Sequence, residues 1–130
     1  THSSNNRNLK DVDIYLVDTF GETKKFHKIG NSVFIGGSIV RRGGQNPLEA
    51  ARYGAKILHG KNINNFKDVY KLLKSLRISK VVNSSKKLAS SINFNPNKSN
   101  GNKIKKIGRI ILKKTIKELD YLIKNEFKKT

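Results

Sequence analysis

Several residue types and patterns that mark particular classes of protein are missing from this sequence. It contains no Cys, Met or Trp and only two Pro. The absence of Cys excludes disulfide scaffolds, thiolate zinc sites and cysteine nucleophiles. No run approaches the ~18 apolar residues that are needed to span a bilayer, and no signal-peptide pattern opens the chain. We therefore expect a cytoplasmic chain that does not span a membrane.

Acidic residues are also scarce, and their scarcity sets the charge. Nine Asp and Glu stand against 28 Lys and Arg, which gives a formal net charge of +19 over 130 residues. An excess of this size attracts anions such as nucleic acids, anionic membranes and phosphorylated substrates. The charge does not select among them, because a Lys-rich surface can also be a simple solvated face. The length allows one domain with a modest core.

The order of hydrophobic patterns along the chain predicts an α/β fold. Strands that alternate with helices are typical of βαβ units with a parallel sheet. In such sheets, ligands bind beyond the carboxyl ends of the strands. Residues 1–10 are expected to be a loose lead-in. The predicted strands are 12–17 (buried), 32–36, 55–58 and 78–82, and the predicted helices are 21–29, 46–53, 64–76 and 84–92.

The last part of the chain predicts a loop at 93–102, followed by a basic helix at 103–130. The helix carries Ile and Leu near one stripe, with Lys and Arg over the rest. Packing of the stripe on the sheet is the default for such a helix. Contact with an anionic membrane or with a separate acceptor domain remains open. The stripe consists of Ile104, Ile107, Ile111, Leu119, Leu122 and Phe127.

The most informative stretch is a glycine-rich loop between a predicted strand and a predicted helix. Gly36, Gly37, Gly43 and Gly44 would allow a ligand to approach the backbone without a Cβ in the way. Asn46 is expected to cap the helix, with Pro47 at its first position and Glu49 completing a capping box. Free amides at a helix start bind anions. The stretch therefore predicts a site for a phosphate-bearing ligand.

A second glycine turn, Phe20-Gly21-Glu22, follows the first predicted strand. Both turns are therefore expected to meet at the carboxyl edge of the sheet. His27 and His59 lack metal-ligand spacing, so no metal site is expected. Ser38 follows a glycine pair but lacks the Gly-x-Ser-x-Gly pattern of a nucleophile.

Four motifs resemble, in order and spacing, the donor-binding half of Kdo (3-deoxy-D-manno-octulosonic acid) transferase of lipopolysaccharide biosynthesis. The resemblance covers about residues 11–70, with Gln45 where the family usually has His. The motifs are Val17-Asp-Thr-Phe-Gly-Glu22, Val33-Phe-Ile-Gly-Gly-Ser38, Gly43-Gly-Gln-Asn-Pro-Leu-Glu-Ala50 and Asn65-Phe66.

The resemblance implies the C-terminal half of a GT-B glycosyltransferase, with a Rossmann-like parallel sheet and flanking helices. Residues 11–92 would form the region that binds the CMP-Kdo donor. The chain would lack the first strands of this half, and the catalytic residue and the lipid A precursor acceptor would belong to an absent N-terminal domain. The fragment alone is expected to be inactive. The intact enzyme would lie peripherally on the cytoplasmic face of the bacterial inner membrane and need no cofactor.

The resemblance also implies the residues of the donor site. Seven residues would contact the CMP moiety, and Gly36, Gly37, Ser38, Gly43 and Gly44 would form the supporting loop. Two alternatives remain: a basic nucleic-acid-binding module, which no recognised motif supports, and a related GT-B transferase that uses another nucleotide sugar. The seven implied contacts are Phe20, Gly21, Glu22, Asn46, Pro47, Leu48 and Glu49.

Overall fold

The structure is a computed structural model that describes residues 1–3, 9–95 and 98–126, and its centre is a three-stranded parallel sheet. The strand order is β1-β2-β3, with Val33 opposite Ile57 and Ile57 opposite Ser79. Helices flank the sheet, so the α/β class predicted from the sequence is confirmed. The strands are β1 (Ser32–Ile35), β2 (Lys56–His59) and β3 (Ser79–Val81).

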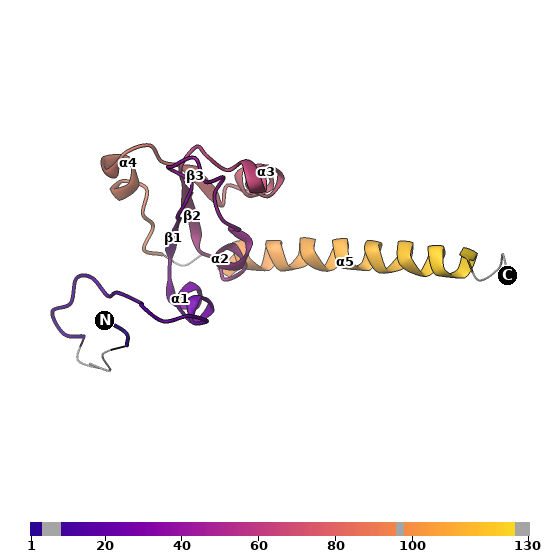
Figure 1. The fold of residues 1–130 in the computed structure, drawn as a ribbon, viewed down its shortest axis with the longest axis horizontal. Coiled ribbons are helices and arrows are strands. Elements are labelled where there is room, and N and C mark those ends of the chain that lie inside the picture. Colours follow the sequence, from indigo (N-terminus) through magenta and orange to yellow (C-terminus); the bar gives the residue numbers. More distant parts are fainter. Residues whose placement is uncertain (4–8, 96–97, 127–130) are drawn as a thin grey trace.

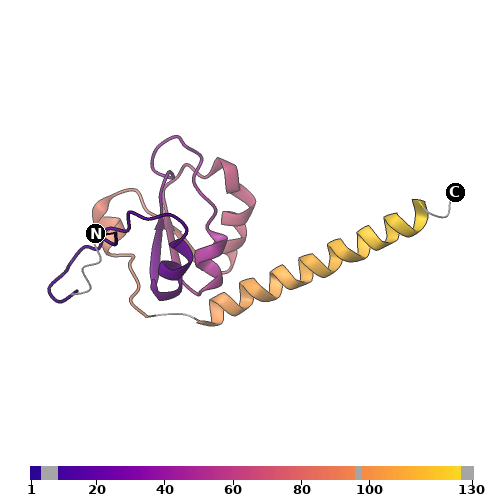
Figure 2. The same ribbon diagram turned by 60° about the horizontal axis from the view of Figure 1, so that its bottom comes forward.

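The helices surround this sheet unevenly. Helices α2 and α3 lie to one side of the strands and α4 lies to the other, while α5 extends away from the body (Figures 1 and 2). Each predicted helix has a counterpart, although most are shorter than expected. The helices are α1 (Thr23–Ile29), α2 (Leu48–Arg52), α3 (Lys67–Ser75), α4 (Ser85–Ala89) and α5 (Lys98–Glu126), with a 3₁₀ turn, η1 (Asn64–Phe66), before α3.

The core lies between the sheet, α2 and α3. Aliphatic side chains of the strands meet Tyr70 and Leu73, the two buried residues of α3, as the helical spacing predicts. Small residues let α2 approach the strands closely, because Ala50 and Ala51 are both fully buried. The core cluster consists of Ile35, Ala50, Ala51, Ala55, Ile57, Tyr70, Leu73, Ile78 and Ile104.

The end of α2 shows how the sequence shapes the body. Gly54 has a φ of +91°, and its N–H donates to the carbonyl of Ala51 at 3.0 Å. The N–H of Ala55 donates to the carbonyl of Ala50 at 3.4 Å. These are the two bonds of a Schellman motif, which needs a residue in the left-handed conformation. The helix predicted at 46–53 therefore ends just before Gly54, which turns the chain directly into β2.

The buried strand predicted at residues 12–17 is wrong. The segment has no strand conformation and is largely exposed, with Ile14 86% and Leu16 60% accessible. A strand is stable only when a neighbour satisfies its N–H and C=O groups. Here the carbonyl of Leu16 instead accepts a hydrogen bond from the N–H of His2 at 2.8 Å. β-propensity alone therefore did not create a fourth strand.

The last helix also differs from its prediction, because α5 begins at Lys98 and not after a loop that ends at 102. Gly101 explains the earlier start. A Cβ at this position would lie 2.7 Å from the carbonyl oxygen of Arg52, so glycine allows the first turn of α5 to press against α2. Phe127, part of the predicted stripe, lies outside the described residues. Across the described ranges, no helix combines the length and hydropathy that a membrane span requires.

Candidate functional site

The glycine-rich loop leaves the carboxyl end of β1, where a parallel sheet offers its ligand sites. Gly37, Gly43 and Gly44 have φ angles of +70°, +80° and +75°. Residues that carry a Cβ rarely adopt this left-handed region. The N–H of Gly44 donates to the carbonyl of Gly37 at 3.1 Å and closes the loop on itself. These three glycines are therefore required by the path of the backbone, whereas Gly36 is not.

Ser38 fastens this loop to the segment that follows β2. Its buried hydroxyl donates to the carbonyl of Ile35 at 2.6 Å and accepts from the N–H of Gly60 at 2.8 Å. The N–H of Asn62 donates to the carbonyl of Ser38 at 2.8 Å, and its side-chain amide donates to the carbonyl of Ile39 at 2.6 Å. Ser38 therefore joins the loop after β1 to the segment after β2 through hydrogen bonds.

Two glycines allow the loops to approach this closely. A Cβ on Gly60 would lie 2.3 Å from the carbonyl oxygen of Ser38, and a Cβ on Gly43 would lie 2.5 Å from the side-chain nitrogen of Asn65. Asn65 in turn donates from its backbone N–H to the carbonyl of Gly43 at 3.1 Å. The structure therefore brings together the loops after β1 and β2.

The structure places the N-cap of α2 at Pro47, one residue later than predicted. Asn46 still satisfies a backbone donor at the start of the helix. Its side-chain oxygen accepts a hydrogen bond from the N–H of Leu48 at 3.0 Å, and the carbonyl of Pro47 accepts from Ala51 at 3.1 Å. Glu49 is half exposed, and its carboxylate lies 3.9 Å from Nδ1 of His27 on α1. Within the described residues the Glu49 side chain makes no bond back to the N–H of Asn46, so the predicted capping box is not formed, and the Glu49 carboxylate faces His27 on α1 instead. Because α2 has only five residues, its dipole is small.

His59 of β2 and Tyr70 of α3 pack against each other, and Tyr70 contacts the end of the glycine-rich loop. Their ring centroids lie 4.3 Å apart, and the Tyr70 hydroxyl donates to the carbonyl of Gln45 at 3.2 Å. Burial raises the pKa of Tyr70 to about 12. Burial also lowers the pKa of His59, which favours the neutral ring, and its Nδ1 lies 2.7 Å from the carbonyl oxygen of Gly60. Because a carbonyl only accepts, Nδ1 is the protonated nitrogen of the neutral ring.

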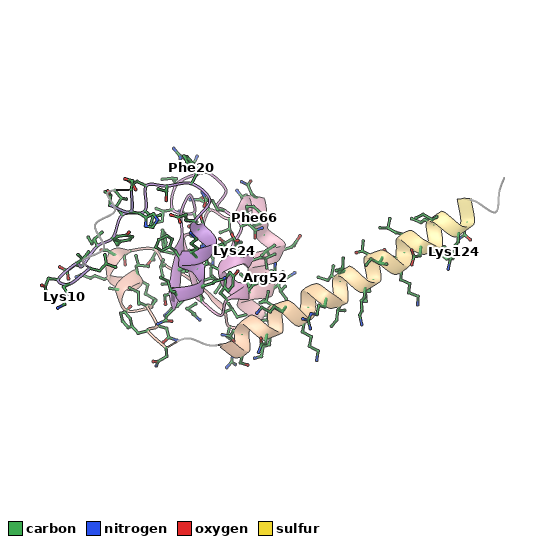
Figure 3. All side chains as sticks on the ribbon, turned by 90° about the horizontal axis from the view of Figure 1, so that it is seen from below. Lys10, Phe20, Lys24, Arg52, Phe66 and Lys124 are labelled. Atoms are coloured by element: carbon green, nitrogen blue, oxygen red, sulfur yellow. The ribbon has the colours of Figure 1, made fainter. Side chains whose placement is uncertain are left out.

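The Phe20-Gly21-Glu22 turn lies elsewhere. It leads into α1, which lies beside the amino end of β1 in Figure 1, whereas the glycine loop follows the carboxyl end. Phe20 is fully exposed at the outer edge of the body (Figure 3). Since residues 12–17 form no strand, the expectation that both turns follow strands and meet at the carboxyl edge is wrong. The contact with α2 comes from His27, further along α1.

The Glu22 carboxylate binds residues of the N-terminal segment and of α1. Its carboxylate contacts the His2 ring, accepts from the Thr19 hydroxyl at 2.7 Å and pairs with the Lys25 ammonium at 2.7 Å. The bonds from Lys25 and then Thr19 lower the pKa of Glu22 to about 2. The residue is therefore ionised at neutral pH, and it holds the N-terminal segment against α1.

Two clefts adjoin the start and the end of α2. A groove of about 910 Å³ is lined by Asn46 and Glu49 together with residues of α3 and α5. A smaller cleft of about 260 Å³ is lined by five residues, Lys24, Glu49, Arg52, Tyr53 and Lys105. Lys24 and Arg52 lie close together in Figure 3. Three of the five lining residues are cationic, so the surroundings of Glu49 favour an anion. No group of three or more His, Cys, Asp and Glu within the described ranges could hold a metal ion.

Comparison with known proteins agrees with the resemblance found in the sequence. No protein-family model matches the chain. It is 32% identical over 71 residues to a 3-deoxy-D-manno-octulosonic acid transferase of Haemophilus influenzae, covering 55% of this chain and 17% of that protein. It is 31% identical over 103 residues to the enzyme of the same name from Rickettsia prowazekii, covering 79% of this chain and 22% of that protein. The chain matches part of a Kdo transferase.

A further relative widens the comparison. A bifunctional glycosyltransferase/methyltransferase of Fusobacterium nucleatum is 36% identical over 67 residues, which is 52% of this chain and 10% of that protein. The chain thus spans about a fifth or less of the length of these three relatives. The first two relatives are named as transferases of 3-deoxy-D-manno-octulosonic acid, and the third is named as a glycosyltransferase joined to a methyltransferase.

Sequence reasoning found the glycine loop but missed the residues that hold it. Gly60, Asn62 and Tyr70 make contacts that only the fold brings together, because they lie 22 to 25 residues away from their partners in the sequence. One signal was present: the Asn65-Phe66 motif lies next to these residues, and Asn65 contacts the loop. A motif without an assigned chemical role is therefore a good candidate for a structural support.

Proposed function

We propose that this chain is the donor-binding part of a Kdo transferase and holds the CMP moiety of CMP-Kdo between the glycine loop and the start of α2. The observation that carries the proposal is the loop itself. It leaves the carboxyl end of a parallel strand, is closed by glycines in the left-handed region and leads directly into Asn46. This is the place where parallel sheets bind nucleotides.

Each part of the site has a proposed task. The backbone around Gly43 and Gly44, together with Asn46, Pro47 and Leu48, would face the phosphate and the base. The half-exposed carboxylate of Glu49 suits ribose hydroxyls, because it can accept two hydrogen bonds from a diol. Nearby cations would offset the phosphate charge without a metal ion. They are Lys24, Arg52 and Lys105.

The Phe20-Gly21-Glu22 turn is a separate part of the proposal. In this structure Glu22 is bound to Lys25 and Thr19, and Phe20 projects into solvent. Contact with CMP would require the N-terminal segment to move toward the glycine loop. The site is therefore proposed to consist of a fixed half at Asn46–Glu49 and a half at Phe20–Glu22 that joins only with the nucleotide.

We extend the proposal to the whole enzyme as follows. The intact protein would transfer Kdo from CMP-Kdo to a lipid A precursor and release CMP, with the catalytic group outside the present 130 residues. It would work peripherally at the cytoplasmic face of the bacterial inner membrane. The excess of Lys and Arg supports attraction to an anionic surface.

Titration of CMP onto the ¹⁵N-labelled chain tests the donor site. Amide resonances of the glycine loop and of residues 46–49 should shift together as CMP is added, while those of α4 should not. Shifts at residues 20–22 would show that the second half joins. Shifts confined to α5, or no saturable shift, would contradict the proposal.

Matched variants and ligands make this experiment specific. Glu49→Gln should weaken CMP binding about tenfold, since a hydrogen bond to a charged group is lost, whereas Glu118→Gln on α5 makes the same charge change without effect. UDP and GDP should bind more weakly than CMP. Tighter binding of either would favour a transferase that uses another nucleotide sugar. Steeply salt-dependent binding of duplex DNA without a CMP response would favour a nucleic-acid-binding module.

A further inference from the structure

The imidazole ring of His27 on α1 is buried, and its Nδ1 has no hydrogen-bond partner in the described part of the chain. Only 14% of the side chain is exposed. Buried polar atoms in folded proteins are nearly always hydrogen-bonded, because an unpaired one loses its bonds to water and gains none in return. Packing alone would favour an apolar residue at this position, so the unpaired nitrogen indicates a function beyond the packing of α1 against α2.

The carboxylate of Glu49 on α2 faces this nitrogen without binding it. Its Oε2 lies 3.9 Å from Nδ1 of His27, which is about 1 Å longer than an ordinary hydrogen bond. Across residues 1–3, 9–95 and 98–126, no other basic side chain has a nitrogen within 4.0 Å of that carboxylate. Half of the Glu49 side chain is exposed to solvent, so a small rotation of it is free to close the gap.

The direction of the Glu49 carboxylate decides which cleft it serves. The residue lines both the groove beside α3 and α5 and the smaller cleft that contains Lys24, Arg52 and Lys105. A glutamate side chain has several rotatable torsions, and a ligand that binds it must overcome the loss of this freedom. A hydrogen bond from His27 would fix those torsions, because the buried ring is itself held by the packing of α1.

We propose that His27 is a positioning residue for Glu49 in the donor site. When a ribonucleotide binds at the start of α2, the Nδ1–H of His27 donates to Oε2 of Glu49 and holds the carboxylate toward the ribose diol. This role rests on the proposed function, in which Glu49 accepts hydrogen bonds from ribose hydroxyls. The two oxygens of a carboxylate together offer about four acceptor sites, so the bond from His27 leaves room for both hydroxyls.

The consequence of this arrangement is selectivity for nucleotides that carry the ribose diol. A site that hydrogen-bonds a hydroxyl discriminates against an analogue that lacks it, because polar groups of the protein are then left unpaired. Without the diol, the His27 ring and the Glu49 carboxylate keep the separation that they have in the free chain. His27 therefore contributes affinity only for ligands that carry these hydroxyls.

Three substitutions of His27 separate the nitrogen from the bulk of the ring. His27→Phe keeps an aromatic ring but has no nitrogen. His27→Asn places an amide N–H near the position of Nδ1, whereas His27→Gln places one near the position of Nε2. His27→Asn should therefore restore most of what His27→Phe loses, and His27→Gln should not. Circular dichroism of each variant checks that the fold is unchanged.

Calorimetric titration of the full chain with CMP and with 2′,3′-dideoxycytidine 5′-monophosphate measures the contribution of the ribose hydroxyls. The native chain should bind CMP about tenfold more tightly than the dideoxy compound. His27→Phe should weaken CMP binding about fivefold and leave the dideoxy compound unchanged, so that the preference falls to about twofold. The control is Lys28→Ala, which removes an ammonium 6.0 Å from the Tyr53 ring, an α1–α2 contact apart from Glu49. It should leave the preference as in the native chain.

A double-mutant cycle shows whether His27 acts through Glu49. Glu49→Ala removes the acceptor, so the addition of His27→Phe to that variant should weaken CMP binding no further. A fivefold loss in both backgrounds would mean that His27 acts independently of the carboxylate, and it would contradict the proposal.

The outcomes distinguish this role from the donor site itself. An equal loss of affinity for CMP and the dideoxy compound in His27→Phe, or no loss for either, would overturn the positioning role and leave the donor site intact. Failure of His27→Asn to restore the preference for CMP would do the same. If the native chain shows no saturable binding of CMP, the donor site and the role of His27 are both wrong.

Discussion

Two segments of this protein carry the same sequence pattern of apolar run, glycine turn and helix, yet only one of them forms a strand. The run in β1 pairs with β2 and leads into the glycine loop. The run at residues 12–17 pairs with no strand, and its contacts are with the start of the chain and with α1. The difference lies in the neighbours: β1 has an adjacent strand, whereas residues 12–17 pair with no strand of the described part of the chain.

The comparison also separates two kinds of stabilisation. The loop after β1 is held by buried hydrogen bonds and by glycines at van der Waals contact with the next loop. The turn at residues 20–22 is held by exposed ionic contacts of Glu22. Removal of one partner of a buried hydrogen bond costs about 1–3 kcal/mol, whereas an exposed ion pair contributes about 0–1 kcal/mol. The following variants measure this difference.

The largest expected effect is at Gly60. Gly60→Ala would place a Cβ 2.3 Å from the carbonyl oxygen of Ser38, so the two loops must separate. We expect a loss of about 3 kcal/mol in the free energy of unfolding, measured by urea denaturation. Gly36→Ala is the control, since a Cβ there meets nothing within 4 Å. Equal stability of the two variants would show that the loops after β1 and β2 are not in close contact in solution.

Truncation of matched isoleucines tests whether the two apolar runs differ in burial. Ile57 of β2 is fully buried and Ile14 is 86% exposed. Ile57→Ala should lower the free energy of unfolding by about 3 kcal/mol through lost burial and a cavity. Ile14→Ala should change it by less than about 0.5 kcal/mol. A large effect at Ile14 would mean that residues 12–17 are buried in solution, as the sequence predicted.

Two serines give a smaller and sharper contrast. Ser38→Ala leaves the buried N–H of Gly60 without its acceptor and should cost about 2 kcal/mol. Ser3→Ala removes a hydroxyl that donates to Asp18 at the surface, and we expect a change of less than about 0.5 kcal/mol. Denaturation curves of the two variants, recorded side by side, check this. CMP affinity should fall only for Ser38→Ala, because only that serine positions the proposed donor loop.

The smallest effect is expected from the titration of Glu22, whose pKa is lowered to about 2 from an ordinary value of 4.5. A lowered pKa means that the contacts of the ionised form are fully present above the ordinary value and are lost as the pH falls toward about 2. Carboxyl chemical shifts should report this midpoint. Lys25→Ala should raise it, since the Lys25 hydrogen bond is the largest cause. An ordinary midpoint in the native chain would show that the turn is not held in this way.

Sequence patterns predicted much of the fold because they act locally or through burial. The strands predicted at 32–36, 55–58 and 78–82 and the helices predicted at 46–53 and 84–92 all lie within a few residues of the observed elements. Caps and turn glycines satisfy backbone groups that lie next to them in the chain. The assignment of residues 12–17 failed because a strand depends on a partner that local sequence does not specify.

The same distinction applies to the candidate site. The glycine loop and the hydrogen bond of Asn46 at the start of α2 could be recognised from the sequence, since their conformation depends on the residues themselves. The positions of Gly60 and Asn62 against Ser38 could not, because those contacts join segments that are far apart in the chain. Sequence signals also missed the early start of α5, which depends on the close fit of Gly101 against Arg52.

The sequence by itself determined the α/β class, the glycine loop, the resemblance to Kdo transferases and the amphipathic charge pattern of the last helix. Only the tertiary structure decided which apolar run became a strand, which loops meet beyond the sheet, and that the aliphatic face of α5 extends past the body. The physical reason is the range of the interactions. Propensity, capping and charge belong to neighbouring residues, whereas strand pairing and close packing exist only between segments that the fold brings together.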